Sequence, residues 1–162
     1  MRAKYYELLD KQRSKSVQYE VLKSVISIYK DDEIGPQDLD VYGHALNKLT
    51  TEFVDHQDPN IRFLGIQLLQ DTMDEKTKHV FGPKIFKKFI SEKEQSILNL
   101  LISIMKSTVD ILNYKAVLGS LFDKFKKQQN LLAINSILEI EEEFIFLLDS
   151  EPNREEAYSL FQ

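Results

Sequence analysis

The chain contains no cysteine among its 162 residues, which excludes disulfides, thiol nucleophiles and thiolate metal sites. It contains only 5 glycines and 4 prolines, too few for a turn-dense β-sandwich or β-barrel. Its formal net charge is −5, whereas a general nucleic-acid binder needs clustered lysine and arginine to neutralise phosphates. These absences indicate a mostly helical chain that does not bind nucleic acid.

Long apolar runs are missing as well. The longest apolar-rich run, Ile97–Met105, contains two polar residues and is far too short to span a bilayer. The first residues, Met1–Glu7, lack the apolar stretch of a signal peptide. With 43% apolar and 29% charged residues, the composition is that of a soluble globular protein rather than a disordered tail. We therefore expect an intracellular, cytoplasmic protein.

Acidic charge is concentrated at the C-terminal end. Residues 128–162 carry eight acidic residues and one basic residue, a net charge of −7, whereas residues 1–127 carry a net charge of +2. This asymmetry predicts a boundary near Gln128. We expect a helical-repeat segment over 1–127, and acidic C-terminal helices over 128–162 that pack as the terminal cap of the same domain. A solvated helix face explains these acids more simply than a binding tail does.

Apolar residues recur every three or four positions along nearly the whole chain, which is typical of helices buried on one face. One such helix is predicted between Pro36 and Asp55. The sharpest start signal is Asp58-Pro59, where a capping carboxylate precedes a proline at the first helical position, and this helix should end near Thr72 or Met73.

Further helix boundaries are predicted downstream. The Gly82-Pro83 step should interrupt or initiate a helix. The segment Ser91–Glu94 is typical of a capping box that opens the helix from Gln95 to Lys106, and Asp110 should open the next one. A final helix is expected over Leu131–Leu148.

The helix pairs begin near Pro36, Lys76 and Asp110, so each unit spans about 34 to 40 residues. This period favours an all-α fold of antiparallel helix pairs, a HEAT/armadillo-like α-solenoid, although an antiparallel globular bundle has almost the same pattern. Near the N-terminus, two arrangements of Tyr5 and Leu9 are open. They pack against a preceding repeat or a partner subunit, or they fold onto the helix of this chain that begins at Ser14 or Ser16.

The apolar faces predict the core. It should contain Val17, Val21, Leu22, Val25, Ile28, Tyr29, Leu39, Tyr42, Leu46, Leu49, Phe53, Ile61, Leu64, Leu68, Ile85, Phe86, Phe89, Ile90, Ile97, Leu98, Leu101, Ile104, Met105, Leu112, Ala116, Leu118, Leu121, Phe122 and Phe125. Gly65 and Gly119 lie inside predicted helices, where glycine is unfavourable, and close helix–helix approach would explain them.

Catalytic chemistry has no candidate in the sequence. The imidazoles of His44, His56 and His79 lack the partners of a helical zinc pair, and the isolated glycines cannot form a phosphate-binding loop. The carboxylate runs 31–33 and 141–143 lack a neighbouring group that would separate their pKa values, as general acid–base catalysis requires. Residues 31–33 also lack the ligand spacing of an EF-hand calcium loop. We assign no catalytic, cofactor-binding or metal-binding residue, and we expect a protein that is not an enzyme.

A modest basic patch is formed by Lys84, Lys87, Lys88 and Lys93, with Phe86 and Phe89 between them. It could contact a membrane surface or an acidic partner, but the solvated side of an amphipathic helix is the simpler interpretation.

Several blocks resemble one known family. Ser14–Glu20 has the form S-x-S-V-x-Y-E, and Asp58–Leu69 has the form D-x-N-[IL]-[RK]-[YF]-[LV]-[GA]-[IL]-x-x-L, both typical of adaptin N-terminal trunks. Ala45–Leu49 resembles the A-x-x-x-L block between them, and Phe89–Ile97 resembles a later helix start. The likeness covers roughly residues 8–127. It leans towards the delta-type large subunit of a clathrin-type vesicle adaptor complex, although the Arg pair that usually follows Ser-Ile is absent after Ile97.

The resemblance implies a non-catalytic scaffold in vesicle-mediated protein transport. Its implied partners are other adaptor-complex subunits and a small GTPase, and its implied location is peripheral, on Golgi or endosomal membranes. Family trunks are much longer, so the resemblance also implies a fragment or a reduced relative. The alternatives are another helical-repeat scaffold of the coatomer, karyopherin or microtubule-binding type, or a small helical-bundle enzyme.

Overall fold

The computed structural model describes residues 2–31, 39–74, 77–109, 113–128, 134–140 and 142. All the regular secondary structure in these residues is helical, which confirms the prediction of an all-α class. The chain divides into two compact units, Met1–Thr77 and Lys78–Gln162. The boundary predicted near Gln128 stays a prediction, because most of the segment beyond it lies outside the described residues.

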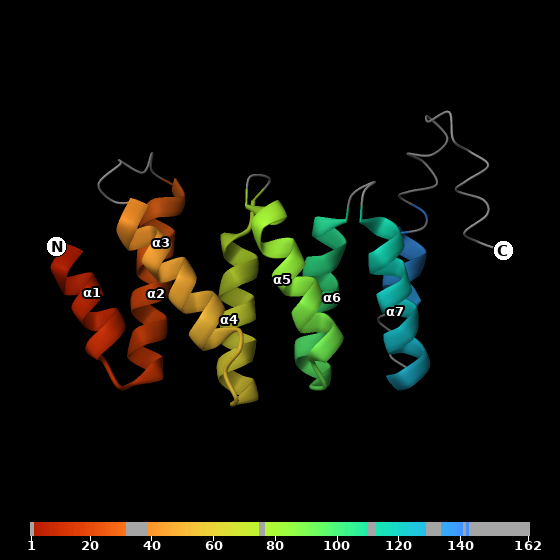
Figure 1. Cartoon of the computed structure of the whole chain (residues 1–162), viewed down its shortest axis with the longest axis horizontal. Coiled ribbons are helices and arrows are strands. Elements are labelled where there is room, and N and C mark those ends of the chain that lie inside the picture. The colour runs from red at the N-terminus through yellow and green to blue at the C-terminus, as the bar shows by residue number, and fades with distance from the viewer. Residues whose placement is uncertain are drawn as a thin grey trace. The chain divides into compact units, whose positions relative to one another are not determined.

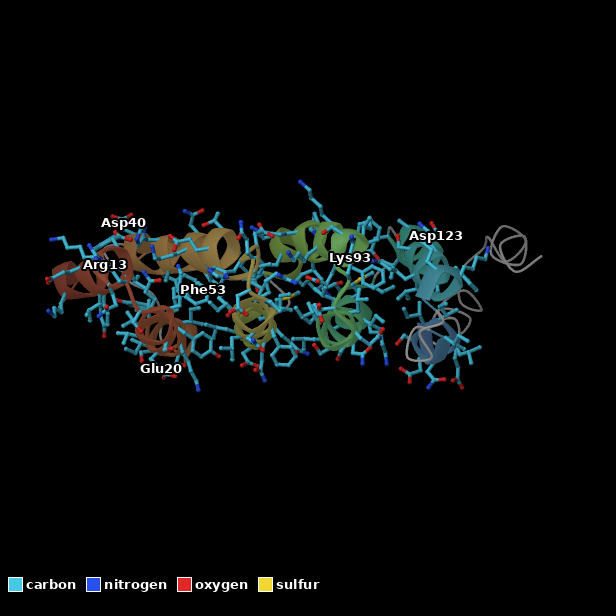
Figure 2. All side chains as sticks on the ribbon, turned by 90° about the horizontal axis from the view of Figure 1, so that it is seen from below. Arg13, Glu20, Asp40, Phe53, Lys93 and Asp123 are labelled. Carbon is cyan, nitrogen blue, oxygen red and sulfur yellow. The ribbon has the colours of Figure 1, made fainter. Side chains whose placement is uncertain are left out.

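The N-terminal unit contains α1 (Arg2–Lys11), α2 (Lys15–Asp31), α3 (Leu39–Lys48), the π-helical segment η1 (Leu49–Phe53) and α4 (Pro59–Thr72). Figures 1 and 2 show α1 and α3 in one layer of this unit and α2 and α4 in the other. The layers meet on an apolar core made of Leu9, Leu22, Val25, Ile26, Val41, Ala45, Leu49, Phe53, Val54, Ile66, Leu68 and Leu69.

The helix predicted between Pro36 and Asp55 is present as α3 followed directly by η1. The amide of Val54 donates to the carbonyl of Leu49 at 3.0 Å, the five-residue step of a π-helix. This wider turn shifts the buried stripe, which combines Val41 and Ala45 with Leu49 and Phe53. Of the predicted stripe, Leu49 and Phe53 are buried, whereas Leu39 is exposed.

The start of α4 confirms the sequence prediction. Asp58 is the N-cap, its Oδ1 accepts a hydrogen bond from the amide of Asn60 at 2.8 Å, and Pro59 occupies the first helical position. The helix ends at Thr72, as expected. Arg62 closes the preceding loop, because its Nη1 donates to the carbonyls of His56 at 2.9 Å and Gln57 at 2.7 Å.

The predicted buried face of α4 needs a correction. Leu68 is buried, but Leu64 is 39% exposed, so the prediction was wrong for Leu64. The buried face runs instead through Gly65, Leu68, Leu69 and Thr72. The physical reason is Gly65: a Cβ built there would lie 2.7 Å from the Cβ of Phe53, so the glycine face is the one that packs against η1.

The C-terminal unit contains α5 (Lys78–Ser91), α6 (Gln95–Thr108) and α7 (Tyr114–Gln128), and residues 134–140 are also helical. Among the described residues, α5 packs against both α6 and α7 (Figure 1). The predicted face of α6 is confirmed in full. Its buried members are Ile97, Leu98, Leu101, Ile102, Ile104, Met105 and Thr108.

Helix α6 begins at Gln95, as predicted, but two sequence-based expectations about helix ends in this unit were wrong. Pro83 lies inside α5, so the Gly82-Pro83 step neither starts nor interrupts the helix. The Ser91–Glu94 capping box is also absent, because Ser91 is the last residue of α5 and its hydroxyl donates to the carbonyl of Lys88. Oε1 of Glu92 accepts hydrogen bonds from the amides of residues 93 and 94 in the turn before α6, and the N-cap residue, Glu94, makes no side-chain capping bond.

Some predicted core residues lie at the surface because they occupy the edges of their helical stripes. Besides Leu64, the exposed ones are Val17, Ile28, Leu39, Ile90, Ala116 and Phe122. The predictions for Asp110, for Leu112 and for the side chain of Phe125 lie outside the described residues. In α1, Leu9 is fully buried and Tyr5 is half-buried. Part of the apolar surface of α1 is therefore covered by the N-terminal unit itself.

We expect Leu68→Ala to lower the free energy of unfolding by about 2–5 kcal/mol, because it leaves a cavity at a buried position of α4. Leu64→Ala is the matched control, and we expect a loss below about 1 kcal/mol from this exposed position. Urea denaturation of both variants measures the difference. Equal losses would contradict the orientation of α4.

We expect Gly65→Ala to destabilise the protein by about 1–3 kcal/mol, because the new methyl group would collide with the backbone and Cβ of Phe53. Gly119→Ala makes the same change in α7, where the added Cβ meets nothing within 4 Å. It should stabilise the protein by about 0.4–1 kcal/mol through helix propensity. Thermal melting of the two variants should therefore shift in opposite directions. A stabilised Gly65→Ala would contradict the close approach.

Candidate functional site

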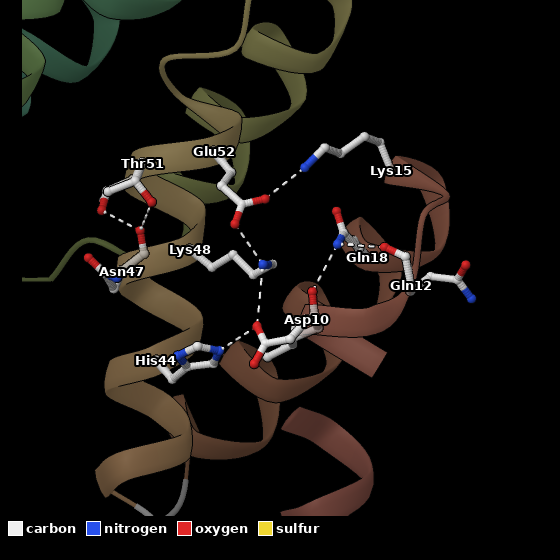
Figure 3. A network of polar contacts seen from close by, with 11 residues as sticks. Asp10, Gln12, Lys15, Gln18, His44, Asn47, Lys48, Thr51 and Glu52 are labelled. Atoms are coloured by element: carbon white, nitrogen blue, oxygen red, sulfur yellow. Dashed lines mark hydrogen bonds and ion pairs between the residues drawn. The ribbon is translucent and has the colours of Figure 1, made fainter. Parts of the chain in front are cut away.

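One polar cluster joins four elements of the N-terminal unit. It contains Asp10 of α1, Lys15 of α2, His44 and Lys48 of α3, and Glu52 of η1 (Figure 3). We refer to these five residues as the charged cluster.

Lys48 is the centre of the charged cluster. Its Nζ lies 2.6 Å from Oε1 of Glu52 and 3.4 Å from Oδ1 of Asp10. Lys48 is only 8% exposed, so its ammonium sits at the edge of the core. A cation in such a position needs charged partners, because burial without them strongly disfavours the charged form.

The two carboxylates each bridge a second base. Oδ1 of Asp10 also lies 2.9 Å from Nε2 of His44, and Oε2 of Glu52 lies 2.8 Å from Nζ of Lys15. Each carboxylate therefore links two elements: Asp10 ties α1 to α3, and Glu52 ties η1 to α2. The charged cluster closes the α1–α2 pair onto α3 and η1.

The electrostatics follow from this geometry. Burial by itself would raise the pKa of Asp10, but the hydrogen bonds and charges of His44 and Lys48 together lower it. Burial would likewise raise the pKa of Glu52, and the hydrogen bonds and charges of Lys15 and Lys48 together lower it. Both carboxylates are thus held in the ionised form by the bases around them.

Aromatic and amide contacts extend the charged cluster. The ammonium of Lys15 lies 5.1 Å from the ring centroid of Phe53, and the rings of Tyr6 and His44 are 5.0 Å apart. The buried side chain of Gln18 donates from Nε2 to the carbonyls of Leu9 and Gln12, both at 2.8 Å. Gln18 therefore fixes the turn between α1 and α2.

The contacts of the charged cluster are structural: they connect helices to one another. His44 hydrogen-bonds to the carboxylate of Asp10, and its ring lies tilted against that of Tyr6, so its described contacts link α3 to α1. No group of three or more potential metal ligands occurs in the part of the chain that the structure describes. The arrangement links α1, α2, α3 and η1 through hydrogen bonds and ion pairs.

None of the other described residues singled out from the sequence belongs to the charged cluster. His56 accepts a hydrogen bond from the amide of Asp58 in the loop before α4. The side chain of His79 and most of the carboxylate runs 31–33 and 141–143 lie outside the described residues. In the basic patch, Lys87 and Lys93 are exposed, whereas Phe89 is fully buried and belongs to the core.

The sequence contained a weak signal for the charged cluster. His44, Lys48 and Glu52 are spaced four residues apart, and Lys48 occupies a position of the buried stripe where an apolar residue would be expected. The partners Asp10 and Lys15 are more than thirty residues away in the chain, so only the folded structure brings them together.

No family model matches the chain, and the comparisons with curated proteins and with solved structures also find no match. Over the described residues, none of the helices combines the length and the apolar character needed to cross a membrane.

We expect Lys48→Met to flatten the acid limb of the stability profile. Asp10 and Glu52 have lowered pKa values in the folded state, so they contribute stability at pH values above their unfolded pKa values of about 4. This contribution is lost as the pH falls through the folded values. Without Lys48, both pKa values move back up, and the free energy of unfolding falls less steeply between about pH 5 and pH 2.

Urea denaturation across this pH range measures the slope. Lys4→Met is the matched control, because it removes an exposed lysine of α1 that pairs with Glu7 outside the charged cluster. Its acid limb should follow that of the unsubstituted chain. Parallel acid limbs for the two variants would show that Lys48 does not hold the carboxylates.

Proposed function

We propose that the chain is part of a non-catalytic helical-repeat scaffold of the HEAT/armadillo type, resembling the N-terminal trunk of an adaptin large subunit. The observation that carries this proposal is the layered order of the helices. In the N-terminal unit, successive helices alternate between two layers, with α1 and α3 in one and α2 and α4 in the other (Figure 2). Alternation of this kind is the packing of stacked two-helix repeats.

The positions of the resembling blocks support the same interpretation. Ser14–Glu20 covers the start of α2, and Asp58–Leu69 covers the start and most of α4. These two helices occupy the same layer and contact each other. The two blocks therefore lie on the second helices of two successive pairs, α1–α2 and α3–α4.

Residues of both blocks perform structural roles suited to a repeat. Gln18 ties α2 to the end of α1, and Tyr19 lies with its ring centroid 6.4 Å from that of Phe53. In the second block, Asp58 caps α4 and Gly65 allows close contact with η1.

A scaffold of this kind works through its surface. Under this proposal the partners are other subunits of an adaptor complex and a small GTPase, and the complex carries the chain to Golgi or endosomal membranes as a peripheral component. The charged cluster then has a mechanical role: it fixes the angle between repeats, so that the surface presented to a partner is rigid.

Exposed apolar side chains in the α2–α4 layer give this proposal a surface to test. Ile28 is 44% exposed on α2, and Leu64 is 39% exposed on α4. Isolated exposed apolar residues are ordinary on any protein, but in a scaffold they are the groups that a partner subunit covers.

The test is reconstitution with purified small and medium adaptor subunits. We expect the tagged chain to retain the small subunit of a delta-type complex in a co-expression pull-down, with binding quantified by titration. Ile28→Asp/Leu64→Asp should weaken this binding by about tenfold or more, because charged side chains would be buried at the interface. Ser27→Asp/Gln67→Asp is the control, since it adds the same charge at exposed polar positions of the same helices.

Failure of the chain to bind any small or medium subunit would remove the adaptin-like proposal. Equal binding by both double variants would retain the scaffold but place its partner on another face. Circular dichroism of both variants establishes that any loss of binding is not a loss of folding.

A further inference from the structure

A cavity of about 260 Å³ lies within the C-terminal unit, between α5, α6 and α7. It is lined by Lys78, Gly82, Pro83, Phe86, Met105, Thr108, Asn113, Ala116 and Val117. Pro83 and Ala116 are exposed, whereas Met105, Thr108 and Val117 are buried. The cavity therefore opens to solvent between α5 and α7, and its inner wall is formed by α6 and α7.

Gly82 is the feature of this cavity that packing does not explain. Glycine destabilises a helix interior relative to alanine, and Gly82 lies within α5. At Gly65 the neighbouring Phe53 leaves no room for a Cβ, but at Gly82 an added Cβ meets nothing within 4 Å. Because glycine has no side chain, the cavity wall at Gly82 is formed by the backbone alone. A backbone exposed in this way is typical of positions that a ligand approaches closely.

The lining combines apolar side chains with a few polar ones. The side chains of Pro83, Phe86, Met105 and Val117 provide the apolar surface. Lys78 is the one charged residue among the described lining residues, and its charge favours an anion. Because an ammonium has three donors, Lys78 can hold a carboxylate in addition to its contacts within the chain.

Two further polar lining residues, Thr108 and Asn113, make hydrogen bonds within the chain. The hydroxyl of Thr108 donates to the carbonyl of Met105 at 2.9 Å, and the amide of Asn113 donates from Nδ2 to the carbonyl of Thr108 at 3.0 Å. These bonds fix the end of α6 and the start of α7 around the cavity.

We propose that this cavity binds a short fatty acid, with the carboxylate at Lys78 and the alkyl chain between Phe86, Met105 and Val117. The volume sets the length of the chain. A cavity of about 150 Å³ holds a benzene ring, so 260 Å³ suits an alkyl chain of about eight carbons. Apolar burial provides the affinity, and the lysine selects the carboxylate and its orientation.

Octanoate is the probe, titrated into the full chain and followed by ¹H–¹³C NMR of the methyl groups of Met105 and Val117. We expect saturable shifts of these signals with octanoate. Acetate, which carries the charge alone, should give none, and octanol should bind more weakly by about tenfold because it lacks the charge. N-acetylphenylalanine tests whether the site takes a peptide C-terminus instead.

Three variants locate the site. Gly82→Leu fills the cavity and should weaken octanoate binding by about tenfold or more, since the alkyl chain loses its space. Gly119→Leu is the matched control, because it is an exposed glycine of α7 with equally open surroundings that does not line the cavity. It should bind as the unsubstituted chain does. Lys78→Met should remove the preference for octanoate over octanol.

Several outcomes would overturn the proposal. They are the absence of saturable shifts with octanoate, equal octanoate binding by Gly82→Leu and Gly119→Leu, and binding of N-acetylphenylalanine in preference to octanoate. If Gly82→Leu fails to fold, as judged by circular dichroism, the preference ratio of Lys78→Met decides the question. A ratio unchanged by Lys78→Met would remove the assigned orientation and with it the proposal.

Discussion

Phe53 and the glycine opposite it set the geometry of the N-terminal unit. A Cβ at Gly65 would lie only 2.7 Å from the Cβ of Phe53, closer than van der Waals contact allows, so the glycine lets α4 approach η1 closely along this face. The same phenylalanine is 1% exposed, neighbours the ring of Tyr19 and lies beneath the ammonium of Lys15. Contacts with α2 and α4 therefore meet at one side chain. Because close-packed interiors adjust poorly to changes in volume, this position constrains both helices together.

The charged cluster lies directly beside this packing. Glu52 precedes Phe53 in the chain, and its carboxylate binds Lys48 in the same helix and Lys15 in α2. The π-helical turn of η1 places an ionisable residue and a core aromatic next to each other at one helix end. Ion pairs at the edge of a core add little energy when solvent reaches them, but they do specify which helices meet. In a scaffold, such specification keeps the angle between repeats constant.

The cavity of the C-terminal unit differs from the charged cluster in kind. It is mainly apolar and has one described charge, whereas the charged cluster has five ionisable groups that satisfy one another. Satisfied groups rigidify a fold, and open apolar volume leaves room for a ligand. The N-terminal unit thus has a network of mutually paired charges, whereas the C-terminal unit has an open, mainly apolar volume.

Helix type and several boundaries were determined by the sequence alone, because they depend on neighbours in the chain. The apolar spacing predicted an all-α class, Asp58-Pro59 predicted the start of α4, and the stripe from Ile97 to Met105 predicted the buried face of α6. Local hydrogen bonds and periodic burial decide these features. The resemblance to adaptin trunks came from local blocks too, and it stays a proposal.

Tertiary structure decided what depends on residues far apart in sequence. The buried face of α4 turned towards Gly65 rather than Leu64 because Phe53, on another element, occupies the space that only a glycine leaves. Lys48 could lie in a core stripe because Asp10 and Glu52 neutralise it, and Asp10 comes from a different helix. Gly82-Pro83 stayed within α5, although the dipeptide by itself is typical of a helix boundary. Apolar periodicity predicts which residues of a helix face inward, but the residues that they contact there are fixed only when the helices pack.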